Sequence, residues 1–395
     1  MTVRTTTHRW MRVGITKALS GLVAAIATAS GCGLEPSDPE LTSDRHAVKG
    51  STWMAEYSDP DAPNMAGVSV AELSVGIADY SQSGLRMIRF EPPPGAPSGV
   101  VDFRVLGHDL VGRDASGAVV LSGAQMVGAK LAFEHHSEPG IWTVQVAAYQ
   151  QRVSHWVEPT DPLPTYRLVW TGPGASPSKP PANLCGNPPP MSDDPLSAAW
   201  LGAESDILLF TGERYDIDSG AVLATGADAD GWINLACART PRANMILYRH
   251  DPTTPAGAGF ATTADQRETL LRMFRADYWG NGTSHSRPGE PLVWEDSQGW
   301  ITSEDPTAFP AGRGSIEAIW TRSGVLCLDT PRRLREEGDA IWAAIESSSP
   351  DGTLPPRCAG IIEYDTGEGI EQLNLEDWHS FSHLAHLVSW NPEGE

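Results

Sequence analysis

The chain has 395 residues, with 28 basic and 50 acidic side chains and a net charge of −22 at pH 7. This negative charge repels the phosphate backbone of nucleic acids, so it excludes nucleic acid as a partner. The sequence contains no Walker A, GxSxG or HExxH motif, so it predicts no cofactor and none of those catalytic classes. Its length allows two domains or one large domain.

The first 31 residues have the pattern of a secretory signal peptide. An apolar run of small residues over 18–29 follows a basic stretch, and the run is shorter than the roughly 20 residues of a membrane-spanning helix. Because residues 1–31 carry four basic and no acidic side chains, their removal changes the net charge from −22 to −26. Anionic lipid headgroups repel such a chain, so a membrane anchor must be a lipid.

The end of this leader offers two cleavage sites. Residues 29–32 (Ala-Ser-Gly-Cys) resemble the lipobox of bacterial lipoproteins, in which the cysteine is acylated and becomes the new N-terminus. Residues 27–29 (Ala-Thr-Ala) also fit an ordinary signal-peptidase site, which would give a secreted protein. We expect acylation of Cys32, with 32–50 as a flexible polar tether. Gly33 after the cysteine favours the outer membrane as the part of the cell envelope that carries the protein.

The cysteine count agrees with export. If Cys32 carries a lipid, an even number remains, as expected of disulfides in an oxidising compartment: Cys185, Cys237, Cys327 and Cys358. Four cysteines allow three pairings, of which we favour nearest neighbours along the chain. Four buried thiols are the alternative. A metal site is less favoured because no two of these cysteines have CxxC spacing.

Residues 51–171 have the pattern of β-structure. Residues 101–106 alternate apolar and polar side chains, while 142–148 and 166–170 are rich in β-branched and aromatic residues. Glycines recur every few residues between these segments, which predicts an antiparallel β-meander without helices. The segment 172–181, rich in Gly and Pro, fits either an interdomain linker or a surface loop.

Residues 183–360 mix helical and strand patterns. A helix over 264–278 is predicted, with Thr262 or Thr263 as its N-cap and Gln266 or Glu268 as the partner in a capping box. Further expected elements are a helix start at Thr330-Pro331, a helix over 339–346, and short strands over 317–320 and 324–327. The fold class is therefore expected to be β-rich α+β, with a few short helices.

Asp277 and His285 are the first candidate site. An acid after a helix, a Gly-rich turn and a histidine eight residues later can meet as a general acid–base pair. In the alternative interpretation, Asp277 accepts hydrogen bonds from turn amides and His285 begins a strand. The acid–base pair predicts an envelope hydrolase, and the alternative interpretation predicts a structural turn.

The C-terminal segment 361–395 holds a second candidate. On a helix, Glu376, His379 and His383 would share one face, as zinc ligands do, and His386 follows. The same stretch has apolar residues at helical spacing, which predicts an amphipathic helix that needs no metal: Trp378, Phe381, Leu384, Leu387 and Val388. Residues 228–231 resemble a calcium loop only faintly, because Gly226 stands where an oxygen ligand is needed.

Residues 275–286 (Arg-Ala-Asp-Tyr-Trp-Gly-Asn-Gly-Thr-Ser-His-Ser) resemble the signature of the ADYC domain, found in exported myxobacterial proteins without an established activity. Further matches place the resemblance over about 103–358. Trp279 stands where the family has the cysteine of its name, and Leu270 where a second cysteine is expected, which suggests that a family bridge is lost as a pair. A catalytic cysteine is not exchangeable for an indole, so the motif is expected to be structural.

The resemblance and the residues together predict a lipoprotein that acts as a binding or structural module. Its expected partners are the membrane, through the lipid, and a protein or a glycan. An envelope hydrolase centred on Asp277 and His285 and a metal-binding protein that uses the C-terminal histidines are the alternatives.

Overall fold

The computed structural model describes a β-rich α+β fold, as the sequence predicts. The described residues are 53–54, 64–65, 68–75, 79–153, 162–173, 180–186, 206–238, 240–254, 261–286, 290–296, 315–359, 361–365, 370–374 and 387–391. No helix in these ranges is long and apolar enough to cross a membrane.

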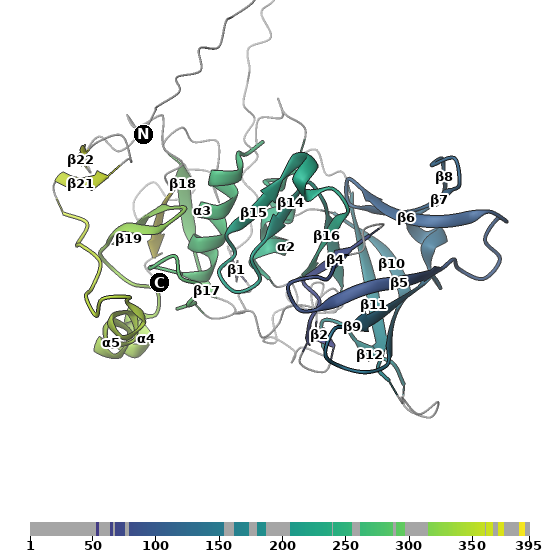
Figure 1. The fold of residues 1–395 in the computed structure, drawn as a ribbon. Coiled ribbons are helices and arrows are strands. Elements are labelled where there is room, and N and C mark those ends of the chain that lie inside the picture. The colour runs from purple at the N-terminus through teal and green to yellow at the C-terminus, as the bar shows by residue number, and fades with distance from the viewer. Residues whose placement is uncertain are drawn as a thin grey trace, which may run out of the picture. The chain divides into compact units, whose positions relative to one another are not determined.

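The largest sheet is antiparallel and has the strand order β4-β16-β13-β11-β10-β9-β5, with β12 paired to β11 (Figure 1). Its strands are β4 (Glu72–Ser74), β5 (Leu85–Glu91), β9 (Lys130–His135), β10 (Ile141–Val153), β11 (Pro162–Thr171), β12 (Ala182–Asn183), β13 (Ile207–Phe210) and β16 (Trp232–Cys237). The residues predicted as strands over 142–148 and 166–170 lie in β10 and β11, which pair in register from Thr143↔Thr171 to Val153↔Pro162 with one bulge.

This sheet joins the two predicted portions of the chain. Strand β4 pairs with β16, and β11 pairs with both β12 and β13. Because Trp170 lies opposite Ala182 in the β11–β12 pair, residues 172–181 connect two neighbouring strands. The strands on either side of this segment therefore belong to one sheet, and the segment does not separate two domains.

A first hydrophobic core lies between the main sheet and a small sheet of strands β6 (Val100–Leu106), β7 (Asp109–Asp114) and β8 (Val119–Ser122). The alternation in β6 buries Phe103 and Val105 and leaves Val101 57% exposed. The short 3-10 helix η2 (Gly123–Met126) adds Met126 to this core and departs from the prediction that residues 51–171 contain no helix.

A second core lies on the other side of the central strands. Leu208 and Phe210 of β13 belong to it, whereas Ile207 and Leu209 belong to the first core, so β13 is buried on both faces. Helices α2 (Pro241–Leu247) and α3 (Ala264–Arg275) fill this second core. Helix α3 also packs against a further sheet, ordered β18-β23-β19-β20: β18 (Val293–Asp296), β23 (Leu387–Asn391), β19 (Ser315–Thr321) and β20 (Gly324–Leu328).

The remaining described elements are small. They are the paired strands β1 (Trp53–Met54) with β17 (Glu290–Pro291), β2 (Asn64–Met65) with β3 (Val68–Ser69), β14 (Glu213–Tyr215) with β15 (Val222–Thr225) and β21 (Ile361–Asp365) with β22 (Ile370–Asn374), the 3-10 helix η3 (Gly226–Ala229), and helices α4 (Leu334–Glu337) and α5 (Asp339–Ser348).

The disulfides join nearest neighbours along the chain. Cys185 after β12 bonds Cys237 at the end of β16, and Cys327 in β20 bonds Cys358 beyond α5. The first bridge ties β12 to a strand across the main sheet, and the second ties the segment after α5 to the second sheet. The predicted pairing is confirmed.

The helix predictions are right in part. Thr263 caps α3 and forms the capping box with Gln266, but the helix ends at Arg275 instead of residue 278 because Ala276 adopts the left-handed conformation. Helix α5 confirms the prediction for 339–346. The start signal at Thr330-Pro331 was misleading, since α4 begins at Leu334 after a left-handed Arg333. The short helix α2 was not predicted.

Several predictions concern residues outside the described ranges. They are the leader 1–31, the acylated Cys32, the tether 32–50 and the helix that would carry Glu376, His379, His383 and His386. Of the apolar positions assigned to that helix, Leu387 and Val388 lie in strand β23, where both are buried.

Candidate functional site

The signature residues 275–286 form a tight turn after α3. The turn requires glycine at two positions, because Gly280 and Gly282 have φ angles of +65° and +91°. A Cβ on Gly282 would also lie 2.6 Å from the carbonyl oxygen of Asp218, and one on Gly280 would collide with the backbone of Ser323. Backbone geometry therefore fixes both glycines of the motif.

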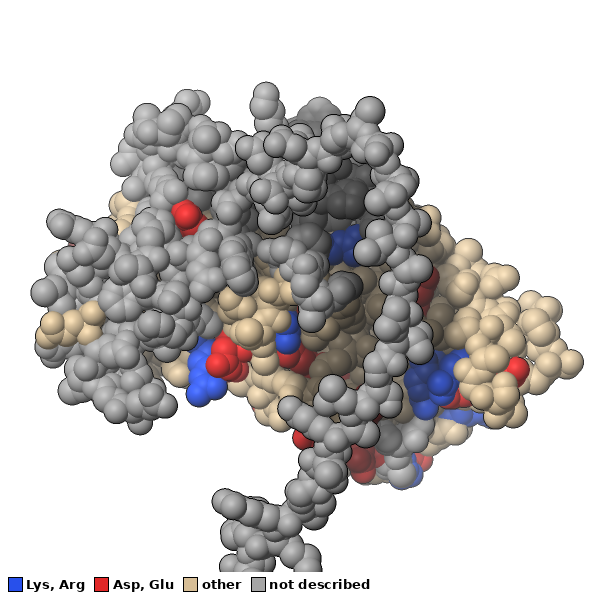
Figure 2. Space-filling view, turned by 90° about the horizontal axis from the view of Figure 1, so that it is seen from above, with Lys and Arg blue, Asp and Glu red and all other residues tan. Residues whose placement is uncertain are grey.

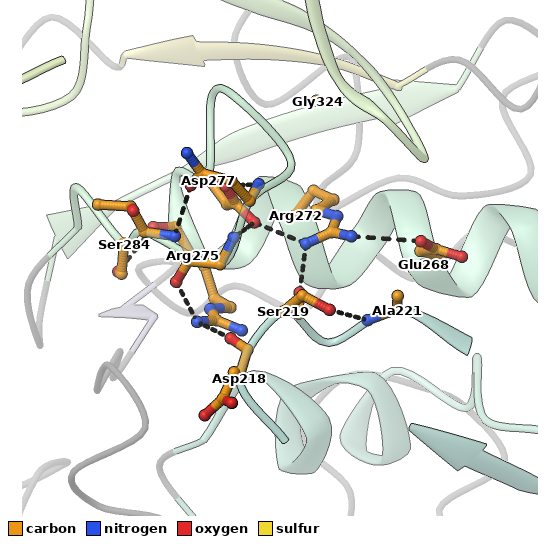
Figure 3. Close-up of polar contacts among 12 residues, drawn as sticks. Asp218, Ser219, Ala221, Glu268, Arg272, Arg275, Asp277, Ser284 and Gly324 are labelled. Carbon is orange, nitrogen blue, oxygen red and sulfur yellow. Dashed lines mark hydrogen bonds and ion pairs between the residues drawn. The ribbon is translucent and has the colours of Figure 1, made fainter. Parts of the chain in front are cut away.

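Asp277 lies at the centre of the hydrogen bonds of this turn (Figure 3). Its side chain is completely buried. Its Oδ1 accepts a hydrogen bond from the backbone N–H of Asn281 at 3.1 Å, and its Oδ2 accepts one from Gly282 at 2.9 Å. Arg272 of α3 donates to Oδ2 at 2.7 Å and also to the carbonyl of Ser219. The carboxylate is thus neutralised by a buried guanidinium and used to shape the turn, as the structural interpretation of Asp277 anticipated.

Three side chains of the turn contact the C-terminal end of helix α5. Trp279 donates from Nε1 to the carbonyl oxygen of Ile345 at 2.8 Å, and Asn281 donates from Nδ2 to that of Ser348 at 2.8 Å. His285 Nε2 lies 2.9 Å from Ser348 Oγ. The last four carbonyls of a helix have no partner within the helix, so the signature supplies an end cap from a distant part of the chain.

His285 is 5% exposed and stacks on Tyr278, with ring centroids 5.5 Å apart. Ser348 Oγ donates to the Ile345 carbonyl, which leaves it as the acceptor for the Nε2 proton of His285. Burial lowers the pKa of His285 to about 4, although the charge of Asp277 acts in the opposite direction. His285 lies outside any strand, and no hydrogen bond joins it to Asp277, although the structure describes both residues.

A second buried network lies beneath the turn and was not predicted. Glu317 of β19 accepts hydrogen bonds from Tyr278 at 2.9 Å, from Arg332 at 3.0 Å on each oxygen, and from Ser389 at 2.8 Å. Burial and the charge of Glu317 raise the pKa of Tyr278 well above its ordinary value. Glu317 lies 72 residues from Ser389 and 39 from Tyr278 in the sequence, so no local pattern indicates the network.

The described residues hold no group of three or more His, Cys, Asp and Glu side chains placed to bind a metal ion. The candidate zinc ligands Glu376, His379 and His383 lie outside the described ranges. On the face that Figure 2 shows, the described basic and acidic side chains lie in small mixed groups.

The sequence model of the ADYC domain matches residues 123–334, which is more than half of the chain. This chain belongs to the ADYC domain family. No curated protein and no solved structure matches it. The ADYC match begins at η2 and ends at the start of α4, so it includes the signature turn, α3 and most of the main sheet.

Trp279, where the resemblance to the ADYC signature implies a cysteine, is partly buried and packs against the second core, to which the fully buried Leu270 also belongs. The indole therefore contributes both apolar contact and a hydrogen bond to α5. Both contributions are structural.

Removing the Asp277 carboxylate tests this structural role. We expect Asp277→Ala to lower the free energy of unfolding by about 3–5 kcal/mol. The variant leaves the buried Arg272 with only Glu268, at 3.3 Å, as a carboxylate partner, and it leaves the amides of Asn281 and Gly282 without their acceptor. Asp265→Ala in the same helix is the matched control: its ion pair with Arg322 is exposed, and we expect a cost of less than about 1 kcal/mol. Urea unfolding monitored by Trp fluorescence measures both. Equal losses in the two variants would contradict the interpretation.

The buried neutral His285 predicts acid sensitivity. Its pKa is about 4 in the folded chain against an ordinary 6.5, so the unfolded chain binds the proton first as the pH falls. The associated stability is complete above pH 6.5 and is lost progressively between pH 6.5 and 4. We expect a loss of roughly 3 kcal/mol over this window, from urea titrations at several pH values. His285→Gln should flatten the curve and the exposed His136→Gln should not, whereas an unchanged curve for H285Q would refute the assignment.

Proposed function

We propose that this chain is a lipid-anchored protein of the cell envelope whose ADYC domain acts as a binding or structural module. The main observation in support is that the polar side chains of the signature form hydrogen bonds within the protein. Asp277 binds Arg272 and two turn amides, while Trp279, Asn281 and His285 bind the end of α5. A motif used in this way supports a rigid scaffold and not a reaction centre.

The cysteines support the envelope address. Four of the five form two disulfides, which persist in oxidising compartments and are rare in the cytosol. Cys32 is the remaining cysteine, and it follows the leader at the position of a lipobox. A lipid there would hold a chain of net charge −26 on a membrane whose headgroups repel it, and would leave the ADYC domain free to meet a protein or a glycan.

Acylation of Cys32 is directly measurable. We expect mass spectrometry of the native N-terminal peptide to find cleavage before Cys32 and a lipid on its thiol, and the protein to fractionate with the outer membrane. Cys32→Ser should abolish acylation and the lipid-dependent membrane association. Ser37→Ala, in the predicted tether, should leave both intact. An intact leader or an unmodified Cys32 in the wild-type protein would exclude the proposal.

One observation favours a hydrolase as the second candidate. Ser348 Oγ and His285 Nε2 lie 2.9 Å apart, within the reach of a nucleophile and its base. However, Ser348 donates its proton to the Ile345 carbonyl, so Nε2 is a donor in this arrangement and not the free base that a nucleophile needs. The pair would have to exchange this hydrogen bond before it could react.

An ester substrate tests the hydrolase. If the domain is a binding or structural module, wild type, Ser348→Ala and His285→Gln should hydrolyse p-nitrophenyl acetate at the same background rate. Ser347→Ala, at an exposed hydroxyl of the same helix end, is the control for nonspecific effects. Turnover that is lost in S348A and H285Q but kept in S347A, with unchanged melting temperatures, would establish the hydrolase instead.

A further inference from the structure

The signature turn contains the one Asn-Gly dipeptide of the sequence, Asn281-Gly282. The backbone requires Gly282, as its positive φ and its approach to Asp218 show. Asn281 is equally constrained: Nδ2 donates to the Ser348 carbonyl, and Oδ1 accepts from the N–H of Thr283 at 3.0 Å. An Asp side chain can make only the second of these bonds. The fold therefore keeps this dipeptide at an exposed turn.

Asn-Gly is chemically labile because glycine has no Cβ to hinder ring closure. The backbone nitrogen of Gly282 attacks Cγ of Asn281, which forms a new N–Cγ bond. The Cγ–Nδ2 bond breaks, and ammonia leaves with the proton from the Gly282 nitrogen. Water then opens the cyclic imide at either carbonyl, which yields aspartate or isoaspartate. The reaction consumes one water molecule and requires no enzyme.

The turn restrains the two groups that must react. The attacking nitrogen has to be free of its proton, but the Gly282 N–H donates that proton to Asp277 Oδ2 at 2.9 Å, and this hydrogen bond fixes the orientation of the nitrogen. Arg275 donates to the carbonyl oxygen of Gly282. The Asn281 amide is held toward α5 through Ser348. Both reacting groups must leave native hydrogen bonds before the ring can close.

We propose that Asn281 is a deamidation site of this protein, that Asp277 slows the reaction in the folded chain, and that deamidation uncaps helix α5. The carboxylate that results has no proton to donate to the Ser348 carbonyl. It also adds a negative charge at the C-terminal end of a helix, where the helix dipole is already negative. The proposal is independent of the envelope function and holds for any cellular address.

The rate of deamidation at Asn281 tests whether the folded turn slows the reaction. The full mature chain and a synthetic peptide of residues 275–286 are incubated together at mildly alkaline pH. Peptide mapping then follows the mass change that replacing –NH2 by –OH produces. We expect deamidation about tenfold slower in the folded chain, because it must wait for local opening of the turn. Hydrogen exchange should find the Gly282 amide protected. Equal rates in chain and peptide, or an unprotected Gly282 amide, would overturn the restraint.

The effect of deamidation on helix α5 is tested with a variant that has aspartate, a product of the reaction, at position 281. Asn281→Asp is expected to shift the unfolding equilibrium about tenfold toward the unfolded chain, through the lost cap and the unfavourable charge. Thr283→Asp adds the same charge two residues away at an exposed position and keeps the Asn281 cap, so it should leave the equilibrium nearly unchanged. Equal effects in the two variants, or none in N281D, would show that deamidation does not uncap α5.

Discussion

A carboxylate without contact to water must be neutralised and hydrogen-bonded, and this constraint on Asp277 organises the second half of the structure. Arg272 of α3 supplies the charge, and the amides of Asn281 and Gly282 supply the remaining donors. Satisfying the carboxylate thus closes the chain into a turn of one defined shape. That shape brings Trp279 and His285 to α5, so the ends of two helices depend on one buried ion pair.

The double burial of β13 has a similar consequence for the whole ADYC domain. One face of the strand completes the first core and the other completes the second, so neither core is complete without it. This arrangement explains why the family match crosses the segment 172–181, which resembles a linker in composition. A boundary there would separate β11 from its neighbours β12 and β13 and expose both cores.

The sequence predicted correctly those features that depend on residues close together in the chain. The N-cap of α3 depends on Thr263 and Gln266, three residues apart, and the alternation of β6 repeats every two residues. Helix α2 escaped prediction because all seven of its residues are buried, which removes the amphipathic period. The pairing of β4 with β16 and the hydrogen bonds of Glu317 join segments that are distant in the sequence. Such partners are decided by the tertiary structure and leave no local sequence pattern. The turn around Asp277 involves residues close in the sequence and could therefore be predicted. Its contact with α5 joins distant residues and could not.

Trp279 stands where the resemblance to the ADYC signature implies a cysteine, so the two side chains can be compared for what each would contribute to the turn. A disulfide stabilises mainly by restricting the unfolded chain, by about 2–4 kcal/mol. An indole acts on the folded chain instead. Full burial of a large apolar side chain contributes roughly 1.5–3 kcal/mol; the partly buried Trp279 gains a part of this, and its bond to Ile345 adds to it. Both routes hold the turn against α3, so an indole can meet the structural requirement that a disulfide between positions 270 and 279 would otherwise meet. A thiol that attacked a substrate would have no such substitute, because an indole is neither nucleophilic enough nor acidic enough to replace a thiolate. The residue at the position of the name-giving cysteine therefore supports a mechanical role for the motif.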